Sequence, residues 1–390
     1  MSPTRPGTAS PPPDPAPRPT RRTVLRGTVA LGTLAAGSTL TSCGGVDADA
    51  ASKPVPGYYP ADYGKIIDGS RREQKLLIYS QTSQTNWQPI FDAFTTRYPW
   101  LADVRATNLG SSAVYERYYS EKATGGSPAD LLVSNGGPLW ADYATRGLAT
   151  AYRSPEKDHL PDWAEILPGV WVFTTDASVI LYNRKTLKES QYPDGLVSLA
   201  DVVEAKPSRF RGKIGVYDAT NAFGYSANEG YTSAVATGWD TFGRLLPFTK
   251  ADHSTGILVE KVVSGEYDAS FNMSGGVAIA AAEDSGGLLG WSYYAEGTVV
   301  MPRSASILKT APHPNAARLF VDFLLSAEGQ AAVAKGGLSP YRPGVKQDSH
   351  DSLQEMQQKL GADHVHVYRY TKVTEEAQEK YVERWDKAAG

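Results

Sequence analysis

Short polar loops in this sequence follow apolar segments of strand character. Segment 75–79 (KLLIY) leads into 80–86 (SQTSQTN), and segment 213–218 (KIGVYD) leads into Thr220-Asn221-Ala222. Hydroxyls, amides and unpaired backbone N–H groups at helix starts donate hydrogen bonds to oxyanions. These residue types therefore predict a site that binds a small polar solute through hydrogen bonds.

The loops need a scaffold that brings them together, and the order of elements predicts one. Strands expected at 75–79, near Val104 and at 129–134 each precede a helix, and the pattern recurs at 213–218 and 267–274. Open α/β sheets bind ligands outside the carboxyl ends of their strands. One further candidate, Thr175, lies in the stretch 171–183. The candidate ligand-binding residues are therefore Ser80, Gln81, Thr82, Ser83, Ser111, Ser112, Asn135, Gly136, Thr175, Thr220, Asn221, Ala222, Asn272, Ser274 and Gly275. Ordinary helix capping by the same residue types remains an alternative.

The N-terminal region differs in composition from the rest of the chain. It is proline-rich up to Thr20, continues with Arg21-Arg22 and an apolar stretch at 27–40, and closes with Leu-Thr-Ser-Cys at 40–43. This resembles a bacterial twin-arginine export signal ending in a lipoprotein processing box. We expect residues 1–42 to be a signal peptide and 43–69 to be a tether. An amphipathic or membrane helix at 27–40 is the alternative.

Cys43 is the single cysteine of the chain, so an internal disulfide cannot form. Lipidation at Cys43 would anchor the protein to the outer face of the bacterial membrane, which predicts an extracytoplasmic lipoprotein. The signal segment has a net charge of +4 and the whole chain −3, which leaves −7 for the mature part. A mildly acidic body without a basic stripe argues against nucleic-acid binding.

The blocks KLLIYSQTSQ, SVILYN, RGKIGVYDATNAFG and SILKTAPHPNAARLFVDFLLSAEGQAAVA resemble the extracellular solute-binding proteins of bacterial ABC importers. The similarity is greatest to the branch that contains ferric-ion, thiamine and organophosphate binders. It implies a two-lobed α/β fold of the periplasmic-binding-protein type (type II), with two strand crossovers and a ligand cleft between the lobes. Expected ranges are 70–173 with 303–345 for lobe 1, and 174–302 with 346–390 for lobe 2. The implied partners are a small-molecule solute and an ABC permease; we expect a monomer without a cofactor.

The ferric binders of this branch hold iron with a tyrosine pair, a histidine and a glutamate. The matching positions here are Ser274-Gly275, a position near Ser83 and one near Asn135, none of which is a strong ferric ligand. We therefore expect no metal site. The companion anion seat of those relatives matches Thr220, Asn221 and Ala222, with help from Asn272. The tyrosine pairs at 118–119 and 293–294 are interpreted as packing residues.

An anionic organic solute, such as an organophosphate or carboxylate, is the favoured cargo. Ferric ion is the main alternative, and a neutral sugar or a polyamine stays open. Trp171 and Phe223 suit either stacking on a ligand or core packing, and Arg303 is interpreted as structural or solvated rather than anion-binding.

A secreted hydrolase is the rival class of protein. The segment 224–228 (GYSAN) narrowly misses the nucleophile-elbow pattern, and Ser226 falls within a predicted helix. His364 and His366 are expected on one face of a strand, without a suitably spaced third metal ligand. We therefore predict neither a catalytic residue nor an enzymatic activity.

Overall fold

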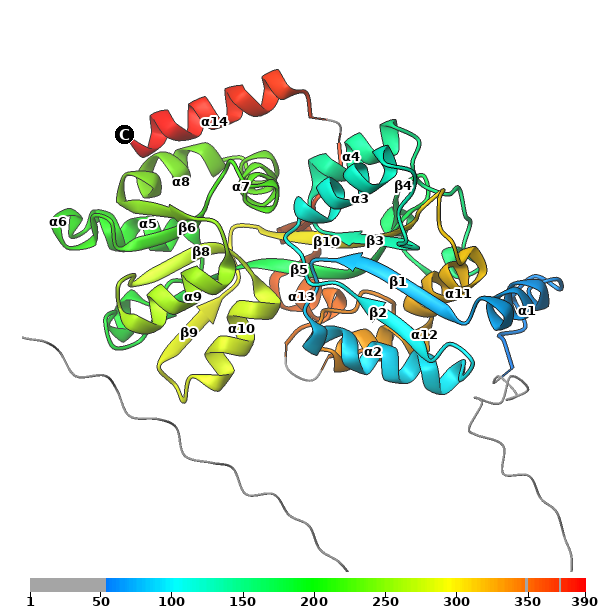
Figure 1. Cartoon of the computed structure of the whole chain (residues 1–390). Coiled ribbons are helices and arrows are strands. Elements are labelled where there is room, and N and C mark those ends of the chain that lie inside the picture. The colour runs from blue at the N-terminus through cyan, green and yellow to red at the C-terminus, as the bar shows by residue number, and fades with distance from the viewer. Residues whose placement is uncertain (1–53, 348–349, 372) are drawn as a thin grey trace, which may run out of the picture. The chain divides into compact units, whose positions relative to one another are not determined.

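Strands and helices alternate along the body of the chain in a computed structural model, which describes residues 54–347, 350–371 and 373–390 (Figure 1). The expected signal segment, Cys43 and the first part of the expected tether lie outside the described residues. The strands are β1 (Lys75–Ser80), β2 (Asp103–Ala106), β3 (Leu131–Ser134), β4 (Glu165–Leu167), β5 (Val170–Asn183), β6 (Ile214–Tyr217), β7 (Thr249–Asp252), β8 (Ala269–Ser274), β9 (Leu289–Ser292), β10 (Thr298–Ile307) and β11 (Val365–Val367). The helices are α1 (Gly64–Glu73), α2 (Gln84–Arg97), α3 (Ala113–Ala123), α4 (Gly137–Thr145), α5 (Leu196–Glu204), α6 (Pro207–Phe210), α7 (Ala222–Ala234), α8 (Gly238–Leu245), α9 (Thr255–Ser264), α10 (Gly275–Asp284), α11 (Pro314–Leu325), α12 (Ala327–Lys335), α13 (Leu353–Leu360) and α14 (Glu375–Ala389).

The strands pair in the order β2-β1-β3-β10-β5-β8-β6-β7, with β11 beside β10 and with β4 and β9 beside β5. In one half β1 pairs in parallel with β2 and β3, and in the other β6 pairs in parallel with β7 and β8. Parallel strands bury both faces and need helical crossovers, which explains their apolar runs and the helices between them. Their carboxyl ends meet at one edge in each half, as the loop positions predict.

Strand β5 joins the two halves. Its residues up to Ala177 pair with β10, and those from Ser178 onward pair with β8 and then with β9. The stretch is one continuous, fully buried strand. Strand β10 makes the return crossing, since it pairs with β11 at its start and with β3 at its end. We propose a lobe boundary between Ala177 and Ser178, slightly beyond the expected one at 173/174.

Helix α2 shows how the sequence pattern builds the first lobe. Ser83 caps the helix by accepting a hydrogen bond from the backbone N–H of Asn86 (3.3 Å). The apolar face of the helix packs inward: Trp87 and Phe94 are buried, and the Phe94 ring lies 4.9 Å from the ring of Phe320 on α11. Helices cover both faces of the sheet in each half (Figure 1).

Part of the expected tether is helical, which corrects the expectation for 43–69. Helix α1 packs against α11, and the buried Tyr63 that precedes it donates a hydrogen bond to the Asp322 carboxylate (2.7 Å). The sequence of α1 is mostly polar and does not indicate this packing. The hydrogen bond from Tyr63 reaches Asp322, which is far along the chain.

The C-terminal part follows the sequence pattern in most respects. Ser326 caps α12, as predicted, by accepting from the Gly329 N–H (3.0 Å). The two histidines of HVH do not share a strand face as expected, since His364 ends a 3-10 turn and only His366 lies on β11. Helix α14 packs on α8. Over the part of the chain described, the helices are too short or too polar to cross a membrane.

Candidate functional site

A cleft of about 290 Å3 lies where strand ends of the two halves meet. It is bordered by loops after β1, β2, β3, β6 and β7, by the start of α10, and by β10. The residues that line it are Gln81, Leu109, Gly110, Ser111, Asn135, Tyr217, Asn221, Phe223, His253, Ser254, Thr255, Ser274, Val277 and Arg303. Side chains far apart in the sequence thus face one space, as expected for a ligand cleft of an α/β protein.

Five predicted residues line this cleft: Gln81, Ser111, Asn135, Asn221 and Ser274. The Ser111 hydroxyl donates to the Asn135 side-chain oxygen (2.8 Å), which leaves the Asn135 amide N–H groups for other acceptors. Asn221 caps α7 by accepting from the Phe223 N–H (3.0 Å). Capping and cleft lining are therefore compatible roles at this position.

Other predicted residues use their side chains within the protein. The buried Ser80 hydroxyl accepts from the Trp87 indole N–H (3.0 Å) and from the Thr82 N–H (2.8 Å). Thr175 is buried against the Ser339 carbonyl, which accepts from its backbone N–H (3.1 Å). Ser80 and Thr175 are therefore buried and are not among the residues that line the cleft. Their hydrogen bonds hold the loop after β1 and the β5 crossing in place.

Positions near helix starts have similar local roles. Ser83 caps α2, and Ser112 precedes α3 without a side-chain capping bond. Thr220 donates from its hydroxyl to Asp218 (2.8 Å). Gly136 packs towards Ala222, whose Cβ would lie 3.6 Å from a Cβ built on the glycine, so the start of α4 meets the start of α7.

Asn272 does not approach the cleft, which corrects a central expectation. Its backbone has a positive φ of 52°, and its side chain is fully buried. Its amide donates to the Asn228 side-chain oxygen (2.6 Å), and its own oxygen accepts from the Tyr294 hydroxyl (2.9 Å). The left-handed turn thus directs Asn272 into a buried polar network instead of towards solute.

Gly275 is also explained by packing. A Cβ built on it would lie 2.6 Å from the Ala177 carbonyl oxygen on β5, so a side chain is excluded by the neighbouring strand.

We expect Gly275→Ala to lower the unfolding free energy by about 1–3 kcal/mol. Gly276→Ala is the matched control, because its nearest neighbour would lie at 3.5 Å, and it should be neutral or slightly stabilising. Urea unfolding of both variants tests this; equal effects would contradict it.

Arg303, interpreted from sequence as structural or solvated, lines the cleft at the β10 crossing and is only 8% exposed. One guanidinium nitrogen is 3.3 Å from the Thr82 hydroxyl and another is 3.4 Å from the Asp176 carboxylate, so both contacts are long. Its Nε has no hydrogen-bond partner among the described residues, and neither has the buried Gln81 Nε2. Burial lowers the pKa of Arg303, while Asp176 raises it.

Asp176 on β5 is the counterpart of this arginine and is 6% exposed. Its carboxylate accepts from the Ser274 hydroxyl (2.5 Å) and from the Gly276 N–H (3.1 Å). The Asp176 side chain therefore occupies the start of α10, where the sequence predicts that Ser274 and Gly275 contact the solute. Sequence reasoning missed Asp176 and favoured a structural or solvated role for Arg303, because both residues lie within strands rather than in loops.

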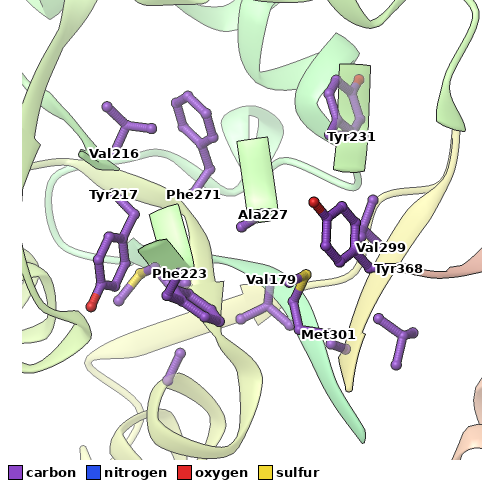
Figure 2. Close-up of a cluster of buried hydrophobic side chains, with 14 of the residues drawn as sticks. Val179, Val216, Tyr217, Phe223, Ala227, Tyr231, Phe271, Val299, Met301 and Tyr368 are labelled. Atoms are coloured by element: carbon purple, nitrogen blue, oxygen red, sulfur yellow. The ribbon is translucent and has the colours of Figure 1, made fainter. Parts of the chain in front are cut away.

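The second lobe contributes aromatic groups and a histidine to the cleft. The Tyr217 and Phe223 rings are 5.0 Å apart at 63°, and Figure 2 shows them at one end of a buried cluster, with the Tyr217 hydroxyl directed away from it. Burial raises the pKa of Tyr217 to about 12. His253 at the rim has Nδ1 3.1 Å from the Asp218 carboxylate. Trp171, by contrast, is buried, and its indole donates to the Tyr152 carbonyl (3.1 Å).

The residues of the rival hydrolase hypothesis do not form a site. Ser226 is buried inside α7, and its hydroxyl donates to the Ala222 carbonyl (2.9 Å). Tyr118 and Tyr294 are fully buried, in line with the packing role expected for their pairs. Among the residues that the structure describes, no three or more His, Cys, Asp or Glu side chains are grouped to hold a metal ion.

Comparison with known proteins assigns the chain to a family. Residues 76–339 match the family model for bacterial extracellular solute-binding proteins. A curated relative, Iron uptake protein A1 of Synechocystis sp., is 24% identical over 325 residues, which cover 78% of this chain and 81% of the relative.

Solved structures show the same two-lobed fold. The substrate-binding protein of an ABC transporter from Agrobacterium tumefaciens aligns with a TM-score of 0.71 at 20% identity, covering 81% of this chain and 95% of that one. Iron-bound HitA from Pseudomonas aeruginosa (TM-score 0.62, 20% identity) covers 81% and 99%, and AfuA from Actinobacillus pleuropneumoniae with bound fructose-6-phosphate (0.65, 20%) covers 81% and 98%. The chain therefore belongs to the bacterial extracellular solute-binding proteins and has a two-lobed fold.

Proposed function

We propose that this protein captures a small anionic organic solute in the cleft and delivers it to the permease of an ABC importer. The observation that carries the proposal is Arg303, a buried cation that lines the cleft together with Gln81; neither the Arg303 Nε nor the Gln81 Nε2 has a hydrogen-bond partner among the described residues. Buried donors without partners cost about 1–3 kcal/mol each, and an oxyanion would satisfy both. We propose Gln81, Asn135, Asn221 and Arg303 as hydrogen-bond donors to the solute, with Ser111 and Ser274 lining the cleft beside them, in a binding rather than a catalytic role.

The donors of the cleft are sufficient for useful affinity. Each hydrogen bond to a charged group contributes about 1.5–3 kcal/mol, and micromolar binding requires about 8 kcal/mol. A few such bonds, with ring contacts from Tyr217 and Phe223, reach that value after the losses of association. The structure of AfuA with fructose-6-phosphate supports an anionic organic cargo for this fold.

Ferric ion is the second candidate, favoured by the relative named Iron uptake protein A1. Of the described residues that line the cleft, Tyr217 alone carries a phenol. Hard anionic oxygens are the ligands that ferric ion prefers, whereas this cleft presents mainly N–H and O–H donors. The donor set therefore fits an oxyanion better than a bare cation.

A thermal-shift screen of the full mature chain against organic anions, sugars, polyamines and ferric citrate tests the proposal. A ligand at 100 times its dissociation constant stabilises the folded protein by about 2.7 kcal/mol. We expect one or more organic anions to raise the melting temperature without colour. A shift produced by ferric citrate alone, with the colour of a ferric–tyrosinate complex, would overturn the proposal in favour of iron.

We also propose that the protein is held on the outer face of the membrane by a lipid on Cys43. The single cysteine after the apolar stretch supports this. Cys43→Ser should release the protein from the membrane fraction into the medium, as measured by immunoblotting of the fractions. Retention of the variant in the membrane would contradict the anchor, and Ser42→Ala is a neighbouring control that keeps the cysteine.

A further inference from the structure

The charged groups of the cleft are already balanced by the chain itself. The cationic side chains among its described lining residues are Arg303 and, when protonated, His253. Each lies beside a carboxylate: Arg303 is 3.4 Å from Asp176, and His253 is 3.1 Å from Asp218. The cleft therefore offers many donors but no net positive charge.

Asp176 also accepts hydrogen bonds from groups that could otherwise bind the second negative charge of a ligand. It takes the Ser274 hydroxyl and the Gly276 N–H at the start of α10, so this helix terminus is already neutralised. A phosphate dianion at Arg303 would be repelled by the Asp176 carboxylate, which is poorly screened because it is 6% exposed. A singly charged group suffers about half of this repulsion and can still pair with the Arg303 guanidinium and the Gln81 amide, whose residues line the cleft.

From this geometry we infer that the cleft selects a singly charged oxyanion, such as a carboxylate, over a doubly charged phosphate monoester, and that Asp176 sets this selectivity. The inference rests on the proposed function and narrows its cargo. Asp176 offsets the extra attraction that a doubly charged group would gain from Arg303, so the second charge of a phosphate costs more desolvation without a net electrostatic gain.

Two probe pairs test the inference by calorimetry at pH 7.5, where both phosphates are dianions. They are benzoate against phenyl phosphate, and gluconate against glucose 6-phosphate. We expect the wild-type protein to bind the carboxylate of the better-binding pair at least about tenfold more tightly. Asp176→Asn should reduce this preference by about tenfold or more, whereas Asp142→Asn, at an exposed carboxylate on α4, should leave it unchanged.

A second measurement does not depend on a variant that folds. Phenyl phosphate is mostly singly charged at pH 5, so its affinity for the wild-type protein should rise relative to that of benzoate between pH 7.5 and pH 5. Comparison with benzoate cancels any effect of pH on the protein that acts equally on both probes. Equal wild-type affinity for the two charge states, or an unchanged preference in folded Asp176→Asn, overturns the inference. If only ferric citrate binds, the proposed function itself fails.

Discussion

Replacing Arg303 with glutamine is expected to abolish tight solute binding while leaving the protein folded. Arg303 is the permanent cation of the described cleft lining, and truncating one partner of a buried charged contact costs about 2–5 kcal/mol. The dissociation constant for the solute found in the screen should therefore rise by roughly 30-fold to several thousand-fold. Isothermal titration calorimetry measures this change directly.

The same substitution should not lower the stability of the ligand-free protein. Wild-type Arg303 is buried, with an unpartnered Nε and two long contacts, while Asp176 keeps its bonds to Ser274 and to the Gly276 N–H. The contact between Arg303 and Asp176 is long (3.4 Å), so its loss removes little compensation from Asp176, while the cost of burying the guanidinium disappears; the net change in stability should be close to zero. Arg146→Gln, at an exposed arginine directly after α4, is the control and should change neither property. Unaltered binding in Arg303→Gln, or a large loss of stability, would show that the arginine is structural.

Asp322→Ala is expected to produce the largest loss of stability among the changes considered. The buried Asp322 carboxylate accepts hydrogen bonds from Tyr63 (2.7 Å), Tyr152 (2.5 Å) and Ser154 (2.6 Å), which join α1 and the segment before β4 to α11. Its removal leaves three buried hydroxyls without their acceptor, at a cost of about 3–5 kcal/mol. Asp92→Ala, at an exposed site on α2, should cost about 0.5 kcal/mol or less.

Asp322 also predicts a pH dependence. Burial raises the pKa of Asp322 to about 7, although the three hydroxyls lower it. An unfolded aspartate has a pKa of about 3.9, so the folded protein holds the extra proton between about pH 4 and pH 7. The contribution of Asp322 to stability is therefore fully present below about pH 4 and is lost as the pH rises through 7.

Asp322→Asn removes this titration and isolates its effect. The unfolding free energy of the wild type minus that of Asp322→Asn should fall as the pH rises from 4 to 7, by up to about 4 kcal/mol, and then level off. Urea unfolding at several pH values gives this difference. A difference that is constant or rises over this range would mean that the folded carboxylate is ionised throughout.

Much of the fold was predictable because local patterns and global structure agree. The apolar runs at 75–80 and 214–217 are buried parallel strands, and the spacing of Trp87, Phe91 and Phe94 gives the buried face of α2. Helix α1 was not predicted, because the hydrogen bond from Tyr63 at its start reaches Asp322, which is far away in the sequence. The pairing switch within β5 leaves no mark in hydrophobic periodicity, since every residue of the strand is buried.

The candidate site was predictable in part, for a related reason. Gln81, Ser111, Asn135, Asn221 and Ser274 follow strands, and the carboxyl ends of parallel strands converge, so their loops face one cleft. The direction of each side chain depends instead on backbone angles and packing. Asn272 turns inward at a positive φ, and Gly275 is bare because the Ala177 carbonyl of β5 approaches it.

The sequence alone therefore indicated the family and the two-lobed architecture through its resemblance to solute-binding proteins, and its local periodicity indicated the polar loops that border the cleft. Tertiary structure decided which groups remain available to a solute. It places Arg303 in the cleft and brings the Asp176 carboxylate into hydrogen-bond contact with the start of α10. Charge pairing between two crossing strands is a property of their three-dimensional register, and no local pattern of residues encodes it.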